Sequence, residues 1–217
     1  MQPVDSTDSF RRYLVVHPLV VRLAHWINAV AIACMAMSGW AIYNASPIFA
    51  FTFPVAITAG GWLGGAIAIH FAAMWLLVLN GFVYVVFSLS TGHFRRAFLP
   101  LHGRDLLRDL RLALTFRLTH VPGVYNAVQR LMYIGVLLCG FLVMASGLAV
   151  WKPVQLDRLA ALFGGYDTAR VVHFLAMSGI VIFVLIHLLL VLIVPGTLLP
   201  MLTGRVHNNV DKERAEP

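Results

Sequence analysis

The chain has 217 residues, of which 60% are hydrophobic and only 12% are charged, and its mean hydropathy is +0.83. This composition excludes a soluble globular domain and indicates an integral membrane protein. The net charge of +7 does not indicate a nucleic-acid partner, because the arginines cluster between apolar stretches, where membrane topology explains them. Only two cysteines occur, Cys34 and Cys139, which excludes a disulfide framework and an iron–sulfur cluster.

Four apolar stretches are long enough to cross a bilayer as helices, since about 20 residues suffice. They cover about residues 19–43, 66–88, 125–150 and 169–194. The intervening stretch 44–65 is apolar but interrupted by prolines and glycines, so we expect an interfacial loop there. The first apolar run is longer than a signal-peptide core, and we expect it to be retained. The sequence therefore predicts a single all-α domain over 1–217, an integral membrane four-helix bundle.

The basic residues predict the orientation of the chain in the membrane. Most of them lie in the N-terminal segment, in the connection between the second and third spans and in the C-terminal tail, whereas the other side has only Lys152, Arg158 and Arg170. By the positive-inside rule, both termini are expected to be cytoplasmic. Residues 102–118 in the long connection predict either a helix on the membrane surface or a solvated cluster of charges.

Histidines are the main functional signal. His173 and His187 lie fourteen residues apart in the last span, which is about 21 Å and nearly four whole turns of a helix. Both imidazoles therefore project from one face, near opposite sides of the membrane. Such a face can hold two haems, each iron taking one axial ligand from this helix and one from a neighbouring helix.

Depth in the membrane predicts the partners. His25 and His187 both lie about two turns from the cytoplasmic side, so they can meet on an inner iron. His70 and His173 both lie near the outer ends of their spans and can meet on an outer iron. The alternative is that each is a neutral histidine bonded to a facing polar group. The remaining histidines are expected to be solvated or interfacial, although His17 or His93 could receive a quinone proton; they are His17, His93, His102, His120 and His207.

Other polar residues lie where a haem or a quinone would need them. Arg22 and Arg170 each precede a histidine by one turn and could bind haem propionates, or serve only as positive-inside anchors. A quinone headgroup needs hydrogen-bond donors beside an apolar channel, and four residues of the inner half are candidates: Tyr84, Asn126, Arg130 and Tyr133. Five glycines mark candidate helix interfaces: Gly39, Gly81, Gly140, Gly147 and Gly179.

A weak internal repeat relates the two halves of the chain. IHFAAM in the second span is similar to VHFLAM in the fourth, and MSGWAI in the first is similar to ASGLAV in the third. The repeat predicts two related helical hairpins. It is imperfect, because the residue fourteen after His70 is Tyr84 rather than histidine.

Several segments together resemble the bacterial di-haem cytochrome b family. They are HPLVVRLAHWINAVAIACMAMSGW with its R-x-x-H-W core, HFAAMWLLVLNG, GHFRR, YNAVQRLMYIGVLL, HFLAM with the following histidine, and LTGR. The family includes membrane subunits of nickel-iron hydrogenases, formate dehydrogenases and thiosulfate reductases, and the resemblance extends from His17 to Arg205. It is greatest to the thiosulfate-reductase-like branch, which occurs with molybdopterin-dependent oxidoreductases.

The resemblance implies two b haems on His25, His70, His173 and His187, in a bacterial inner membrane. It also implies electron transfer between the quinone pool and a partner oxidoreductase subunit, expected to be periplasmic and of the molybdopterin type. Two alternatives remain open from the residues. One is a stand-alone cytochrome b that oxidises superoxide or another small donor and reduces quinone. The other is a haem-free transporter with a histidine relay, although the spans contain no Asp or Glu to complete one.

Overall fold

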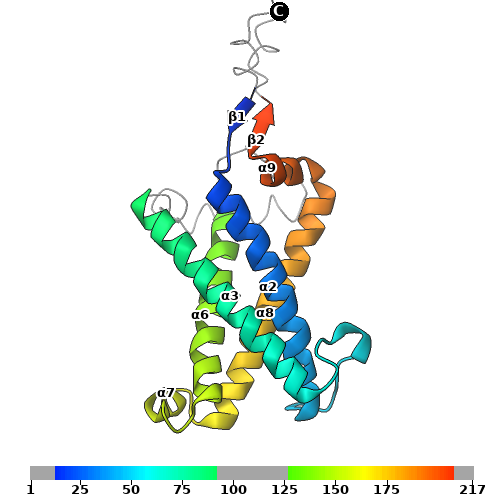
Figure 1. Ribbon diagram of the computed structural model, residues 1–217, viewed down its shortest axis with the longest axis vertical. Coiled ribbons are helices and arrows are strands. Elements are labelled where there is room, and N and C mark those ends of the chain that lie inside the picture. Colours follow the sequence, from blue (N-terminus) through cyan, green and yellow to red (C-terminus); the bar gives the residue numbers. More distant parts are fainter. Residues whose placement is uncertain (1–12, 92–126, 208–217) are drawn as a thin grey trace, which may run out of the picture.

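Four long helices dominate the computed structural model, which describes residues 13–91 and 127–207 (Figure 1). They are α2 (Leu19–Ala45), α3 (Leu63–Ser90), α6 (Ala127–Trp151) and α8 (Tyr166–Ile193). Each includes a segment that is long and apolar enough to cross a membrane. The expected all-α membrane bundle is therefore confirmed. The helices begin and end within three residues of the expected spans, and residues 102–118 lie outside the described part of the chain.

The helices form two hairpins. α2 packs along α3 and α6 packs along α8, as the internal repeat predicted. The residues with the lowest exposure in the described part of the helices are nearly all alanine and serine, whereas leucine, valine and phenylalanine side chains face outward. Small residues let membrane helices approach closely, and the outward apolar side chains suit contact with lipid. In the first hairpin, Asn80 also donates hydrogen bonds to the Ala24 carbonyl at 2.8 Å and to Asn28 Oδ1 at 2.7 Å.

Short elements close the end of the bundle near Leu63 and Trp151. The loop from α2 to α3 has one 3-10 turn, η1 (Val55–Ile57), in agreement with the expected interfacial loop. Between α6 and α8 lies α7 (Asp157–Leu162). Gly164 and Gly165 then turn the chain into α8 with φ of 83° and 102°, values that only glycine adopts freely.

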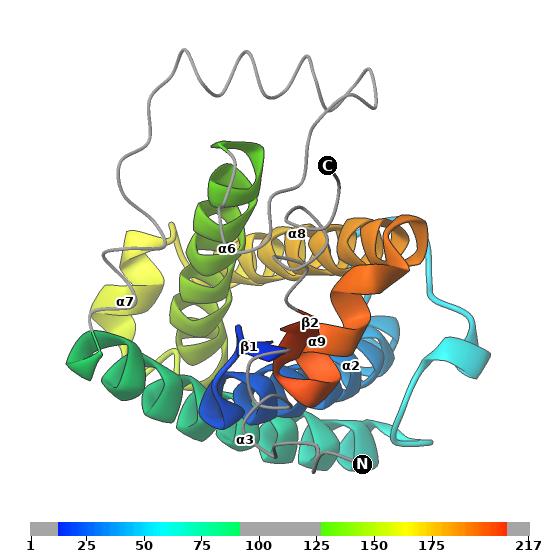
Figure 2. The same cartoon turned by 90° about the horizontal axis from the view of Figure 1, so that it is seen from above.

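At the opposite end, the two ends of the described chain are joined. β1 (Tyr13–Val15) pairs antiparallel with β2 (Arg205–His207), after η2 (Pro195–Thr197) and α9 (Leu198–Thr203). These elements lie across the end of the bundle, between α2 and α8 (Figure 2). Gly204 turns the chain from α9 into β2 with φ of 79°. Both ends of the chain therefore leave the helices at the same end of the bundle.

Replacing Gly204 with alanine is expected to open this junction. A Cβ there would lie 2.8 Å from the His17 carbonyl oxygen and 3.1 Å from Arg22 Nε, at a positive φ. The strain should cost about 1–3 kcal/mol, seen as a lower melting temperature in detergent. Gly196→Ala is the matched control, because its Cβ would meet nothing within 4 Å. Equal melting temperatures for the two variants would contradict this account.

Candidate functional site

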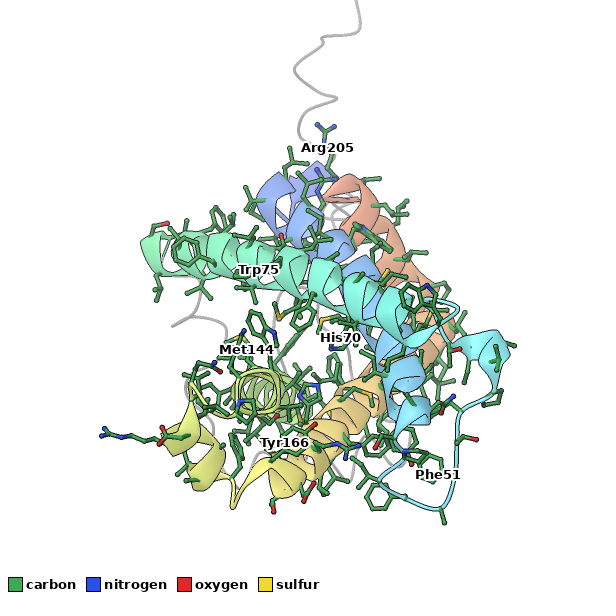
Figure 3. The ribbon with its side chains drawn as sticks, turned by 60° about the horizontal axis from the view of Figure 1, so that its bottom comes forward. Phe51, His70, Trp75, Met144, Tyr166 and Arg205 are labelled. Carbon is green, nitrogen blue, oxygen red and sulfur yellow. The ribbon has the colours of Figure 1, made fainter. Side chains whose placement is uncertain are left out.

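Two pairs of histidines lie where the two hairpins face each other; His25, His70 and His173 are half-buried and His187 is exposed. His70 of α3 meets His173 of α8, with ring centroids 6.4 Å apart and planes at 63°. His25 of α2 meets His187 of α8, with centroids 6.0 Å apart and planes at 64°. Figure 3 shows His70 on the side of its helix that faces the second hairpin. The structure thus brings together the same two pairs that depth in the membrane predicted, and α8 contributes one histidine to each.

The separation within each pair fits coordination of a single metal ion. Imidazole nitrogens bind first-row metals at about 2 Å, so two rings on opposite sides of one ion have centroids roughly 6 Å apart. The pairs measure 6.4 Å and 6.0 Å. Two axial histidines are a known mode of holding haem iron in proteins. The donor type and the spacing of both pairs are therefore suited to bis-histidine haem.

Serines of the neighbouring helices contact the outer pair, which comprises His70 and His173. Ser38 Oγ lies 3.1 Å from His70 Nδ1, and Ser146 Oγ lies 3.2 Å from His173 Nδ1. Both serines are fully buried. Sequence reasoning missed them, although the repeat carried the signal: the two serines occupy equivalent places in MSGWAI and ASGLAV.

The glycine that follows each serine lies against the same imidazole. A Cβ on Gly39 would be 3.5 Å from His70 Cε1, and one on Gly147 would be 3.1 Å from His173 Cε1. Gly179 faces Cys139 across the second hairpin. For Gly81 and Gly140, a Cβ would meet nothing within 4 Å, so the described residues give these two no role in helix packing.

The inner pair, His25 and His187, has different neighbours. His187 stacks on Phe183 with a ring separation of 6.1 Å and planes 10° apart. His25 has its edge contact with Trp26, at 5.4 Å. Each inner imidazole thus contacts a neighbouring aromatic ring of its own helix, where each outer imidazole contacts a serine hydroxyl.

The two arginines expected near haem propionates contact backbone carbonyls. Arg22 donates through one terminal nitrogen to the Leu202 carbonyl, which ties α2 to α9. Its Nε is buried and has no hydrogen-bond partner among the described residues, so one donor remains available. Arg170 donates to the carbonyl of Ser46, the residue that follows α2, and its guanidinium lies 5.9 Å from the ring of Tyr166. Arg170 thereby joins the two hairpins at the end nearest the outer pair.

The structure describes the side chains of two of the four quinone candidates. Tyr84 is half-buried on α3, and Tyr133 is exposed on α6. Arg130 lies on the first turn of α6, where side chains are not described, and Asn126 lies outside the described residues. Among the other histidines, His17 precedes α2 and His207 ends β2, whereas His93, His102 and His120 lie outside the described residues.

A cluster of aromatic rings covers the outer end of the bundle. Phe49, Phe51 and Phe53 of the loop pack on Tyr43 and on Phe174, the residue after His173. Tyr43 and Asn44 hold the loop in place through hydrogen bonds to its backbone. The cluster forms an aromatic layer at this end, in contact with the residue that follows His173. Sequence reasoning described this stretch only as an interfacial loop.

A membrane bundle whose core holds paired imidazoles at two depths has the architecture of a b-type cytochrome. The model of the prokaryotic cytochrome b561 family matches residues 16–204. The chain therefore belongs to the prokaryotic cytochrome b561 family, which confirms the resemblance found in the sequence. It is accordingly a multi-pass protein of the bacterial inner membrane that binds haem b and transfers electrons.

The chain is also similar to a curated protein of Azospira oryzae. That relative is described as "Putative protein-methionine-sulfoxide reductase subunit YedZ1". The two sequences are 46% identical over 190 residues, which is 87% of this chain and 96% of the relative. The alignment therefore covers nearly all of both proteins.

Adding a methyl group at Gly147 is expected to disturb haem binding. At 3.1 Å the new Cβ would be closer to His173 than ordinary packing allows, and such overpacking costs about 1–3 kcal/mol. The haem-to-protein ratio of purified Gly147→Ala should fall. Gly39→Ala is the matched control, because its Cβ would lie at an ordinary contact distance of 3.5 Å. Full haem content in both variants would contradict the tight fit.

Proposed function

We propose that this chain is a di-haem cytochrome b that carries electrons across the membrane between the quinone pool and a partner oxidoreductase at its outer face. One observation carries the proposal: α8 presents His173 and His187 to two different helices, at separations that suit one iron each. The two positions are fourteen residues apart, or about 21 Å along the helix. Two such sites span most of the apolar part of a bilayer about 30 Å thick.

Each histidine pair has a distinct role in this proposal. His70 and His173 hold the outer haem, and His25 and His187 hold the inner haem. Haem b, when bound, supplies one-electron redox chemistry at its iron. The chain supplies ligands from two hairpins, an apolar interior and the aromatic layer at the outer end. Arg22, with a buried donor unused by the described residues, and Arg170 are the proposed partners of the haem propionates.

Substrate chemistry belongs to another polypeptide in this proposal. The loops of the outer end, residues 46–62 and 152–165, are short and hold only a 3-10 turn and α7. The relative from Azospira oryzae bears the name of a protein-methionine-sulfoxide reductase subunit. We therefore propose a periplasmic reductase, of the molybdopterin type that the resemblance implied, as the partner. Reduction of a sulfoxide to a thioether consumes two electrons and two protons and releases water, and a quinol can supply both electrons.

We propose that this quinol binds in the inner half of the bundle. Tyr84 lies fourteen residues after His70, as His187 lies after His173. Tyr133 lies thirteen residues before Ser146, as His25 lies before Ser38. The repeat therefore gives α3 and α6 hydroxyls at the depth where α2 and α8 have imidazoles. We propose that these tyrosines, with Asn126 and Arg130, bind the quinone headgroup, and that this end of the bundle is cytoplasmic.

The first experiment is a reduced-minus-oxidised optical spectrum of the purified protein, with a measured haem-to-protein ratio. Two b-type haems per chain are expected, since two histidine pairs are present. A ratio of one would remove one of the pairs from the proposal. Absence of haem after expression in haem-replete cells would overturn it and favour a histidine relay.

Replacing one histidine of each pair should remove a different haem. His187→Ala is expected to lose the inner haem and quinol oxidation while the outer haem stays reducible by dithionite. His70→Ala should lose the outer haem and keep an inner haem that quinol reduces. Spectra and haem-to-protein ratios of the two variants check the assignment. Retention of both haems in either variant would contradict the proposed pairs.

Removing the tyrosine hydroxyls should slow the reaction with quinol. Tyr84→Phe and Tyr133→Phe keep the ring volume and lose one donor each, which typically costs about 0.5–1.5 kcal/mol, or roughly 2- to 10-fold in the rate of haem reduction by quinol. Reduction by dithionite should be unchanged and serves as the control. Unaltered quinol kinetics in the double variant would exclude these tyrosines from the quinone site.

A further inference from the structure

We infer that Ser38 and Ser146 are positioning residues for the outer haem, each holding an axial histidine in the Nδ1–H form and leaving its Nε2 to bind iron. The inference deepens the proposed function and rests on it. The two serines join the helices of each hairpin, because each lies within hydrogen-bond distance of a proposed ligand on the neighbouring helix.

The hydroxyl of Ser38 fixes the direction of its bond to His70. A serine hydroxyl has a single hydrogen to donate. Ser38 Oγ lies 2.6 Å from the carbonyl oxygen of Cys34, one turn earlier in α2, and that oxygen can only accept. The hydrogen therefore points to Cys34, and Ser38 Oγ must accept from His70 Nδ1 at 3.1 Å. His70 is thus protonated at Nδ1, and its Nε2 carries the free electron pair.

In the second hairpin, the contacts of His173 independently indicate protonation at Nδ1. Ser146 Oγ donates to the Leu142 carbonyl, one turn earlier in α6. His173 Nδ1 lies 3.2 Å from Ser146 Oγ and also 3.0 Å from the Val143 carbonyl, which can only accept. Nδ1 must therefore carry the hydrogen here as well. The same arrangement occurs at equivalent positions of both halves of the repeat, as expected if both ligands need it.

Each serine acts together with the glycine that follows it. The serine oxygen sets the ring orientation through Nδ1, and the Cε1 edge of the ring lies against the next residue, Gly39 or Gly147, where the tighter contact at Gly147 leaves no room for a Cβ. An imidazole held at both points has little freedom to turn. The Ser-Gly pairs therefore orient the outer imidazoles before any metal binds.

The inner histidines lack this support from the described residues. Hydrogen bonds to His25 and His187 are absent within the described part of the chain, where their rings contact each other, Trp26 and Phe183. An acceptor at Nδ1–H raises the basicity of a ligating imidazole, which favours ferric over ferrous iron. The serines should therefore lower the midpoint potential of the outer haem and leave that of the inner haem unchanged.

The chain contains a matched control for these serines. Ser178 of α8 donates to the Phe174 carbonyl one turn earlier at 2.8 Å, the same bond to its own helix that Ser38 and Ser146 make. It makes no other hydrogen bond within the described residues. Replacing Ser178 removes the helix bond alone, whereas replacing Ser38 or Ser146 also removes an acceptor from a proposed ligand.

The test is a potentiometric titration of the purified protein, followed optically, with the haem-to-protein ratio measured alongside. Ser38→Ala and Ser146→Ala are each expected to keep two haems and to shift one transition to higher potential, with a larger shift in the double variant. The shift in Ser146→Ala should be partial, because the Val143 carbonyl still accepts from His173 Nδ1. The shifted transition should be the one that His70→Ala removes. Ser178→Ala, and Ser38→Thr with its hydroxyl retained, should give the unaltered titration curve.

A second readout is the EPR signal of the ferric outer haem, which depends on the angle between the two imidazole planes. It should change in the alanine variants and stay constant in the controls. Two haems with unmoved potentials and EPR signals in the double variant would overturn the inference alone. A protein that binds no haem would overturn the proposed function first. If the double variant does not fold, the potentials and EPR signals of the single variants test the inference in the same way.

Discussion

The contact on which the rest of the structure depends is that between the imidazoles of α8 and those of α2 and α3. A polar ring inside a membrane needs a polar partner, because lipid offers none. The outer imidazoles have their serine partners within their own hairpins, whereas in both pairs the imidazole of α8 faces an imidazole of the opposite hairpin. The two halves of the molecule therefore meet through the groups proposed to hold the haems.

Packing within each hairpin follows a different rule. α2 and α3, like α6 and α8, approach closely through alanine, serine and glycine, and such contacts need no cofactor. Between the hairpins, the described contacts include the imidazole pairs, the aromatic cluster, the Phe71–Trp151 ring contact and the bond from Arg170 to the end of α2. Each hairpin is thus packed within itself, and the imidazole pairs lie where the two hairpins face each other.

The sequence predicted the features that depend on spacing along one helix. The four helices, the two histidine pairs and the hairpin arrangement all follow from hydropathy, helical period and a weak repeat. It did not predict contacts that neither hydropathy nor depth in the membrane can place. The bond from Ser38 to His70 joins residues 32 apart, and the pairing of β1 with β2 joins the two ends of the chain. The packed conformation of the aromatic loop was not predicted, because it depends on hydrogen bonds from Tyr43 and Asn44 of the preceding helix.

The dominant position of α8 has a consequence for biosynthesis. A ribosome makes this helix last of the four, and both histidine pairs include one of its residues. Neither pair exists while the nascent chain has only α2, α3 and α6 in the membrane. With the haem ligands as proposed, haem insertion would follow translation of the final span, and a transcript truncated before α8 would yield a membrane protein with no complete histidine pair at either depth.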